Sequence, residues 1–216
     1  MNNIIGLVIS YVFIAIIIIV AKLFEKKSRE ASRKFIHIML SNWWIIAMIF
    51  FDNVIWACIA PLSFVVINYI SCKKDLISVM EREEKDKDGF GTVYYALALL
   101  IIAIITFGII NRPEIGLCPI LILGYGDGLA AIIGKNVKSM PYKIGKSKKT
   151  IAGSATIFFI SFLLVAIFLA SMQTPMWLLK SILLAISVSV LEAVGTKGTD
   201  NLIVPVFACL LLIVMV

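Results

Sequence analysis

One aspartate lies inside an apolar segment that is long enough to enter a membrane. Asp127 falls within 117–133 and is flanked by Gly124, Gly126 and Gly128. An ionised side chain in a membrane helix costs about 2.5–3.5 kcal/mol on insertion scales, so its presence indicates a functional site. Glycines can open such a helix or admit close backbone approach, and a carboxylate suits Mg²⁺, which takes oxygen ligands and phosphate partners. The alternative is a structural ion pair with a lysine, in a helix whose glycines serve packing.

A basic segment comes directly before a predicted helix start. Thr150 is the expected N-cap of the apolar segment 151–171, because its hydroxyl can accept a hydrogen bond from the first helical turn. The start of a helix presents free N–H groups and the positive end of the dipole, which suits a phosphate. The alternative is ordinary positive charge on the cytoplasmic side of a membrane. The candidate phosphate-binding residues are Lys146, Lys148, Lys149, Thr150, Gly153 and Ser154.

Two more acidic residues flank one predicted turn. Glu192 lies near the end of the otherwise apolar segment 176–194, and Asp200 with Asn201 opens the next segment. Asp200 has the helix N-cap as its alternative role. Glu192 has no such role at the end of its helix, so it is a candidate for catalysis.

A basic cluster lies at the start of another apolar segment. Arg33, Lys34 and His37 lie within five residues, and Arg33 and His37 share one face of a helix because they are four residues apart. His37 is the one histidine of the chain. Its alternative role is packing or contact with the membrane interface.

The elements that must position these residues are membrane helices. The chain is 61% hydrophobic and 15% charged, against about 45–50% and about 25% in a soluble domain, which excludes a soluble globular protein and a disordered chain. We expect one all-α membrane domain over 1–216, a bundle of eight helices with seven as the alternative. Continuous apolar runs, without the alternation of membrane strands, support helices of about 20 residues. The segments are 4–23, 35–51, 54–70, 91–110, 117–133, 151–171, 176–194 and 202–216.

Charge predicts the orientation of the bundle. Four connections and Lys22 hold 18 of the 20 lysines and arginines. Positive residues stay on the cytoplasmic side, so we expect both termini outside, in a plasma membrane of bacterial or archaeal type. The net charge of +7 reflects this topology, and we expect no nucleic-acid partner. The predicted cytoplasmic loops are 24–34, 71–90, 134–150 and 195–201.

Every candidate residue then falls on the cytoplasmic face, where acidic and basic groups converge. An acidic metal site beside a basic phosphate site fits phosphoryl transfer, in which positioning and charge neutralisation do most of the catalysis. The sequence contains no P-loop and no kinase-type glycine-rich loop.

The ordered set of motifs resembles the membrane-embedded CTP-dependent lipid kinases: dolichol kinase, phytol kinase and the yeast-type CTP-dependent diacylglycerol kinase. The stretch 140–154 is most similar to the phytol kinase branch. The chain is short for the dolichol kinase branch, which favours a compact prenol-type or bacterial-type enzyme. The resemblance covers nearly the whole chain, through 33–37, 91–95, 126–134, 149–154 and 192–205.

The resemblance implies transfer of the γ-phosphate of CTP, or of UTP, to the hydroxyl of a membrane prenol, polyprenol or diacylglycerol. It assigns Mg²⁺ to Asp127 and Asp200, and catalysis to Asp127, Glu192, Lys149 and His37, with Glu192 as general base or metal partner. It assigns Arg33 and Lys34, together with His37, to the acceptor headgroup or the phosphate product. The implied nucleotide and phosphate ligands are Gly126, Gly128, Lys146, Lys148, Thr150, Gly153, Ser154 and Asn201.

Three other classes compete with the lipid kinase. The run 127–131 resembles the start of the CDP-alcohol phosphotransferase signature, but Ala131 replaces its arginine and no aspartate occurs between 128 and 199, which excludes that class. A phosphatidate cytidylyltransferase also uses CTP in the membrane and remains the enzymatic alternative. A small transporter is the other alternative, because carriers build sites from glycine-broken helices.

Overall fold

The computed structural model describes residues 2–25, 28–74, 90–144, 147–196 and 198–216. The described part is helical except for one two-stranded hairpin. The prediction of an all-α integral membrane protein is confirmed. The elements are α1 (Asn3–Glu25), α2 (Arg29–Ser41), α3 (Trp43–Phe50), α4 (Val54–Lys74), α5 (Gly91–Ala103), η2 (Ile104–Ile109), α6 (Glu114–Leu121), η3 (Ile122–Asp127), α7 (Gly128–Asn136), β1 (Pro141–Ile144), β2 (Ser147–Thr150), α8 (Ile151–Ser171), α9 (Trp177–Val194) and α10 (Asp200–Met215).

Six helical segments of the described chain are long and apolar enough to cross a membrane. The other two predicted crossings are shorter or divided: α10 has 16 residues, and the segment 35–51 separates into α2 and α3 at Asn42. The Asn42 side chain donates to the carbonyls of Ile38 and Met39 and thereby helps to end α2. Each of the eight predicted segments therefore corresponds to helix, but two of them are not single long helices.

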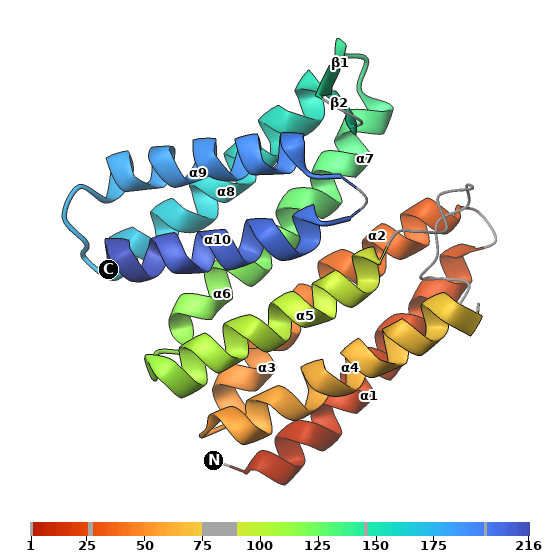
Figure 1. Cartoon of the computed structure of the whole chain (residues 1–216), viewed down its shortest axis with the longest axis vertical. Helices are drawn as coiled ribbons and strands as arrows, with labels where there is room; N and C mark the ends of the chain where they lie inside the picture. Colours follow the sequence, from red (N-terminus) through yellow and green to blue (C-terminus); the bar gives the residue numbers. More distant parts are fainter. Residues whose placement is uncertain (1, 26–27, 75–89, 145–146, 197) are drawn as a thin grey trace.

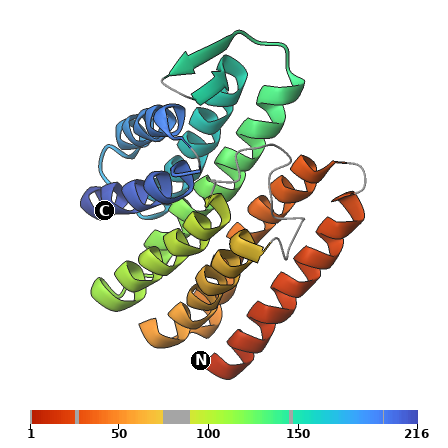
Figure 2. The same cartoon turned by 45° about the vertical axis from the view of Figure 1, so that its right-hand side comes forward.

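The segment formed by α6, η3 and α7 is the centre of the bundle. Of the six long segments it is the most enclosed, with 61% of its apolar window buried against 28–44% for the others. It contacts α2 and α3 on one side and α8 and α10 on the other, while α10 also packs directly against α5 (Figure 1). Both termini lie at the end of the bundle opposite the hairpin, as Figures 1 and 2 show. This agrees with an even number of crossings, and the outside location of the termini stays a prediction.

The glycine-rich run of the central segment forms a wide turn. Residues Ile122–Asp127 adopt a π-helix, which joins α6 to α7 without a break. Such turns occur often at functional sites. Gly124 packs against the side chain of Ser41, and Gly128 packs against that of Ile38. The sequence left two roles open for these glycines, opening the helix or admitting close backbone approach, and the structure shows close approach of α2.

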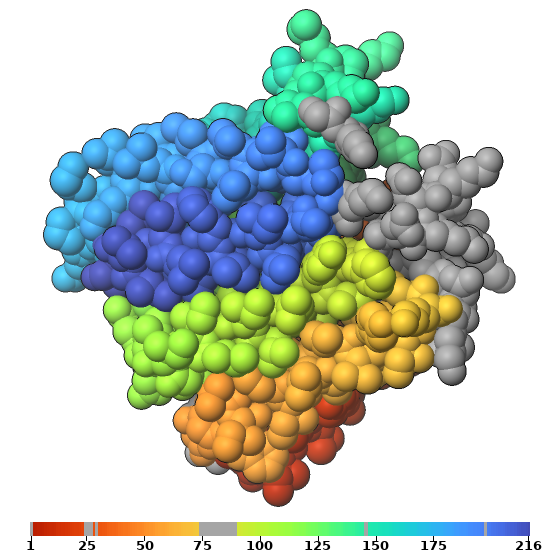
Figure 3. Space-filling model, viewed as in Figure 1, coloured from red at the N-terminus to blue at the C-terminus, as the bar shows by residue number. Residues whose placement is uncertain are grey.

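The hairpin was not predicted from the sequence. Strands β1 and β2 pair antiparallel, with Pro141 opposite Thr150 and Ile144 opposite Ser147. The hairpin projects beyond the helices in the space-filling view (Figure 3). Four-residue strands within a basic segment give too short a pattern to be recognised, yet they fix the lysines that lead into α8.

Candidate active site

A polar cavity of about 750 Å³ lies at the hairpin end of the bundle. Its size falls in the range of about 300–1,000 Å³ that is usual for small-molecule sites. We call it the main cavity. It is lined by residues of α2, the central segment, β2 and the facing ends of α8, α9 and α10: Glu30, Arg33, Lys34, Asp127, Ala130, Ala131, Gly134, Lys135, Ser147, Lys148, Lys149, Thr150, Gly153, Ser154, Glu192, Gly195, Thr196, Gly198 and Asp200.

Three carboxylates meet in the main cavity. Asp127 comes from the π-helical turn, Glu192 from the end of α9 and Asp200 from the start of α10, and one oxygen of each lies within 4.8 Å of the others. Thr199 occupies the N-cap position of α10, so the N-cap role for Asp200 is wrong and its carboxylate can face the cavity. A set of carboxylate oxygens fits Mg²⁺, a hard cation that prefers oxygen ligands.

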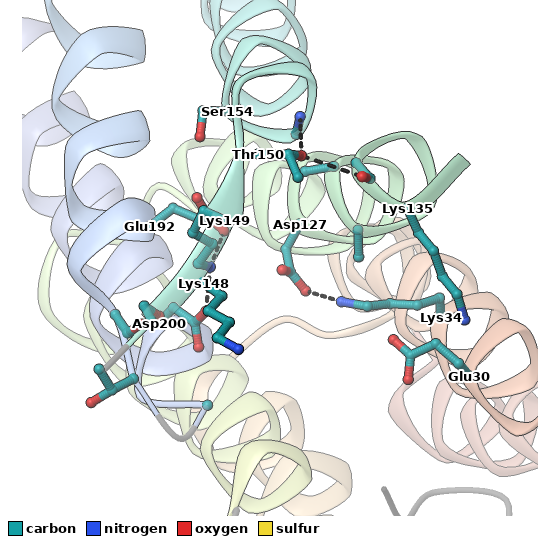
Figure 4. Close-up of a pocket in the computed structure, with 18 of the residues that line it drawn as sticks. Glu30, Lys34, Asp127, Lys135, Lys148, Lys149, Thr150, Ser154, Glu192 and Asp200 are labelled. Carbon is teal, nitrogen blue, oxygen red and sulfur yellow. Dashed lines mark hydrogen bonds and ion pairs between the residues drawn. The ribbon is translucent and has the colours of Figure 1, made fainter. Parts of the chain in front are cut away.

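Lys149 reaches two of these carboxylates from β2. Its Nζ pairs with Glu192 and lies 3.7 Å from an oxygen of Asp200 (Figure 4). Burial by itself would lower the pKa of Lys149, but the charge of Glu192 and its hydrogen bond, together with Asp200, outweigh burial and raise the pKa. Lys149 is therefore a permanent cation at neutral pH. The neighbouring Lys148 is more exposed, as strand alternation dictates, and also lines the cavity.

A cation and an imidazole, Lys34 and His37, hold Asp127 from the α2 side. Nζ of Lys34 lies 2.7 Å from Asp127 Oδ2, and Nε2 of His37 lies 3.1 Å from the same oxygen and 3.1 Å from the carbonyl of Leu123. Both partners of Nε2 are acceptors, so this nitrogen carries the hydrogen. The ion pair with a lysine that was the structural alternative for Asp127 is thus present, and it lies in the wall of the cavity.

Thr150 is the N-cap of α8, as predicted. Its side chain accepts a hydrogen bond from the N–H of Gly153 at 3.2 Å. The N–H of Ile151 donates to the carbonyl of Met140, and that of Ala152 donates to the hydroxyl of Ser139. Gly153 and Ser154 do line the cavity, but these first N–H groups of α8 are already engaged within the protein. The lysine side chains are therefore better placed than these N–H groups to bind a phosphate.

The start of α8 also lies very close to α7. A Cβ added to Gly134 would lie 2.7 Å from Thr150 Oγ1 and 3.4 Å from the Cα of Gly153. Glycine at both positions lets the two helices meet, which is the usual function of small residues in membrane helix packing. Ser147 ties the hairpin to the opposite wall, because its hydroxyl donates to the carbonyl of Gly195 at 2.6 Å.

Four residues that the sequence assigned to the site do not line the main cavity. Gly126 packs toward the side chain of Ile157, and Gly128 packs against α2. The amide of Asn201 donates to the carbonyl of Gly91 at 2.9 Å, and His37 lies behind Asp127. Lys146 lies outside the described residues.

The cavity also contains charged residues that the sequence reasoning missed. Glu30 lies one helical turn before Arg33 and pairs with it at 2.7 Å, and Lys135 lies at the end of α7. Glu30 could have been found from the sequence, because it lies three residues before Arg33 and side chains at this spacing pair on a helix. Arg33 and Lys34 themselves lie on α2, because this helix starts within the predicted loop 24–34, after the N-cap Ser28.

The fold and the site together define a membrane-embedded protein with a cavity of clustered carboxylates and lysines at one end of a helical bundle. Comparison with curated proteins gives a more specific likeness. The chain is 29% identical over 224 residues to the phytol kinase of Synechocystis sp., which covers 96% of this chain and 89% of that protein. The comparison therefore confirms the resemblance to the membrane lipid kinases, in their phytol kinase branch.

Two plant proteins show the same likeness. The probable chloroplastic phytol kinase of Triticum aestivum is 26% identical, and the probable chloroplastic phytol kinase 1 of Oryza sativa subsp. japonica is 27% identical. Each alignment covers 82% of this chain but 64% and 62% of the plant proteins, so the chain spans less than two thirds of their length. No family model and no solved structure matches the chain.

Proposed function

We propose that this protein is a lipid-alcohol kinase, which transfers the γ-phosphate of CTP, or of UTP, to the hydroxyl of a prenol-type membrane lipid. The observation that carries the proposal is the meeting of Asp127, Glu192 and Asp200 with Lys149 in one cavity. The three relatives named phytol kinase support a prenol-type acceptor. Diacylglycerol and polyprenols are the competing acceptors of the same reaction.

The charges of the cavity match a nucleoside triphosphate with its cation. Asp127 and Asp200 would hold Mg²⁺, which when bound neutralises phosphate charge as it develops in the reaction. Lys148 and Lys149 supply positive charge from the hairpin, and Arg33 supplies it from α2. Together these groups would bind a triphosphate beside the carboxylates, with the hairpin as one wall of the site.

The chemistry is an in-line displacement at the γ-phosphorus. The alcohol oxygen forms a bond to phosphorus, the bond to the β–γ bridging oxygen breaks, and the products are a lipid phosphate and CDP. Glu192, the most buried of the three carboxylates, accepts the hydroxyl proton. His37 donates to Asp127 and so holds that carboxylate in place, which makes it a positioning residue.

The location of the site follows from the charge pattern. The main cavity lies at the hairpin end, opposite both termini. The lysine- and arginine-rich connections lie at this end in the predicted topology, so we place the cavity on the cytoplasmic face of a plasma membrane. A cytoplasmic site gives access to cellular CTP and to a lipid hydroxyl at the membrane surface.

The decisive experiment is a matrix of nucleotides and lipid alcohols with purified protein, using nucleotide labelled in either the α- or the γ-phosphate. We expect γ-label, but not α-label, in the lipid product, with CTP or UTP as donor and phytol or geranylgeraniol as acceptor. With phosphatidate added as an acceptor, transfer of α-label with release of pyrophosphate would indicate a cytidylyltransferase. Solute uptake by vesicles without nucleotide would indicate a transporter.

Asp127→Asn provides the matched test of the site. We expect it to lower lipid phosphate formation by at least about a hundredfold, in the range seen when a group that stabilises transition-state charge is removed. Glu114→Gln is the control, because Glu114 is acidic but lies at the start of α6, outside the lining of the main cavity. Full activity of Asp127→Asn would overturn the assignment.

A further inference from the structure

Two smaller cavities continue the main cavity into the bundle. The second has a volume of about 40 Å³ and shares Arg33 with the main cavity. The third has a volume of about 30 Å³ and shares Leu40, Asn68 and Tyr95 with the second. Each exceeds the roughly 10–15 Å³ that one water-sized group needs. The three cavities therefore form a row from the polar end toward the interior.

The row follows three helices in order. Along α2 and α3 its lining passes from Arg33 through His37 and Leu40 to Trp43. Along α4 it passes from Asn68 to Ala60, and eight residues of helix correspond to about 12 Å. The lining changes on the way from charged and amide side chains to aliphatic and aromatic ones. This order matches an amphiphile whose polar end faces the carboxylates.

An unpaired acceptor marks the junction of the second and third cavities. Asn68 is 7% exposed, and its Nδ2 donates to the carbonyl of Thr92 at 3.0 Å. The carbonyl can only accept, so the amide nitrogen must face it and Oδ1 points elsewhere. Among the described residues, Oδ1 has no hydrogen-bond partner. A buried polar atom in this state is costly, which indicates a missing donor.

The third cavity contains an unpaired hydrogen-bond donor, the counterpart of the unpaired acceptor of Asn68. Nε1 of Trp43 is also buried without a partner among the described residues, and Trp43 lines this cavity. A lipid hydroxyl can donate to Oδ1 of Asn68, whereas Trp43 lies deeper in the row, beside the space given to the chain. The small side chains of Ala60 and Ala96 and the ring of Pro61 leave the remaining space to an apolar chain.

We infer that the second and third cavities are the acceptor site: Asn68 holds the hydroxyl of a single-chain lipid alcohol before it advances to Glu192 in the main cavity, and the third cavity holds the first part of its chain. This inference rests on the proposed function and adds the residues that select the acceptor. It also explains the motif at 91–95, which the reaction itself does not use. Thr92 orients the amide of Asn68, and Tyr95 lines both cavities while its hydroxyl holds the backbone of α2 at His37.

The first test separates acceptor binding from nucleotide binding. Asn68→Leu should raise the KM for geranylgeraniol at least about tenfold and leave the KM for CTP within about twofold, because the lost hydrogen bond belongs to the alcohol. Ser161→Ala is the control, since Ser161 Oγ is another buried oxygen without a partner among the described residues but lines none of the three cavities. An unchanged acceptor KM in Asn68→Leu would overturn the inference.

The second test compares activity on a long and a short alcohol within one preparation of each variant. Partial misfolding then affects both substrates equally. Ala60 lies deeper than the reach of a five-carbon prenol bound at Asn68. Ala60→Leu should therefore lower the activity ratio of twenty-carbon to five-carbon alcohol at least about tenfold. The control Ala185→Leu, at an equally buried alanine of α9 outside these cavities, should leave the ratio unchanged. An unchanged ratio in Ala60→Leu contradicts the assignment.

A third measurement needs no variant. A prenol with a photoreactive diazirine in its second isoprene unit should label α4 or α5 at residues of the third cavity, mapped by mass spectrometry. Labelling confined to outward-facing positions such as Ile55 and Val66 would place the chain outside the bundle and overturn the inference. If the wild-type protein phosphorylates no alcohol with any nucleotide, the proposed function itself fails, and the acceptor site fails with it.

Discussion

Lys149 and Glu192 form a partly buried ion pair that joins the hairpin to α9 across 43 residues of sequence. Their side chains are 20% and 6% exposed. The pair joins one cation and one carboxylate of the main cavity from two elements that are not consecutive in the sequence, since α8 lies between β2 and α9. Removing one member of such a pair leaves an uncompensated charge, whereas removing both leaves none.

The ion pair predicts a non-additive double-mutant cycle. Lys149→Met should lower the stability of the detergent-solubilised protein by roughly 3 kcal/mol, and Lys149→Met with Glu192→Gln should recover much of this loss. These two variants and Glu192→Gln alone, which completes the cycle, should all lose lipid phosphate formation. The measurement is the apparent melting temperature together with activity. Additive effects of the two substitutions would show that the side chains do not interact.

The carboxylate cluster predicts a binding site for one divalent cation. Mn²⁺ has the same preference for oxygen ligands as Mg²⁺ and is visible by electron paramagnetic resonance. We expect the wild-type protein to bind Mn²⁺ in competition with Mg²⁺, and Asp200→Asn to weaken binding by about ten- to a hundredfold. Arg112 pairs with Glu114 away from the cavity, so Glu114→Gln should have no effect. Equal binding by all three proteins would exclude the cluster as the metal site.

Glycine packing between helices predicts different outcomes at two positions. Gly134→Ala should lower the melting temperature, because the added Cβ meets Thr150 Oγ1 at 2.7 Å and such overpacking costs about 1–3 kcal/mol. Gly126→Ala meets the side chains of Ile157, at 3.3 Å, and of Ile122, at 3.6 Å, and should retain most of the activity. A large loss of activity with normal stability in Gly126→Ala would instead support its predicted contact with the nucleotide.

Much of this architecture could be predicted from the sequence. A membrane helix is recognised from one apolar segment, and the orientation of the bundle from the charges of the connecting loops. The position of Asp127 in its helix and the N-cap at Thr150 depend on local sequence alone, and both are present in the structure. The pairing of Lys34 with Asp127, 93 residues apart, depends on how helices pack, and no local pattern reports it. The same holds for Asn68. Its side-chain oxygen is left unpaired because its amide nitrogen donates to Thr92, and only the structure shows that contact.

The orientation of the bundle can be tested with fusions. Because the lysine- and arginine-rich connections are predicted to be cytoplasmic, alkaline phosphatase fused after Val216 should be active and green fluorescent protein at the same site should be dark. A fusion within 195–199 should show the reverse. The opposite pattern would place the main cavity on the outer face and contradict a reaction that consumes cytoplasmic CTP.

The role of His37 can be separated from that of a general base by two substitutions. Its Nε2 lies 3.1 Å from Asp127 Oδ2 and from the carbonyl of Leu123, so the nitrogen at this position donates. Glutamine can also donate a hydrogen bond to Asp127 but cannot take up a proton at neutral pH. We therefore expect His37→Ala to lower activity by about ten- to a hundredfold, as the loss of a positioning hydrogen bond does, and His37→Gln to recover most of this loss. Equal inactivity of both variants, with normal melting temperatures, would mean that His37 itself carries the proton and that Glu192 does not.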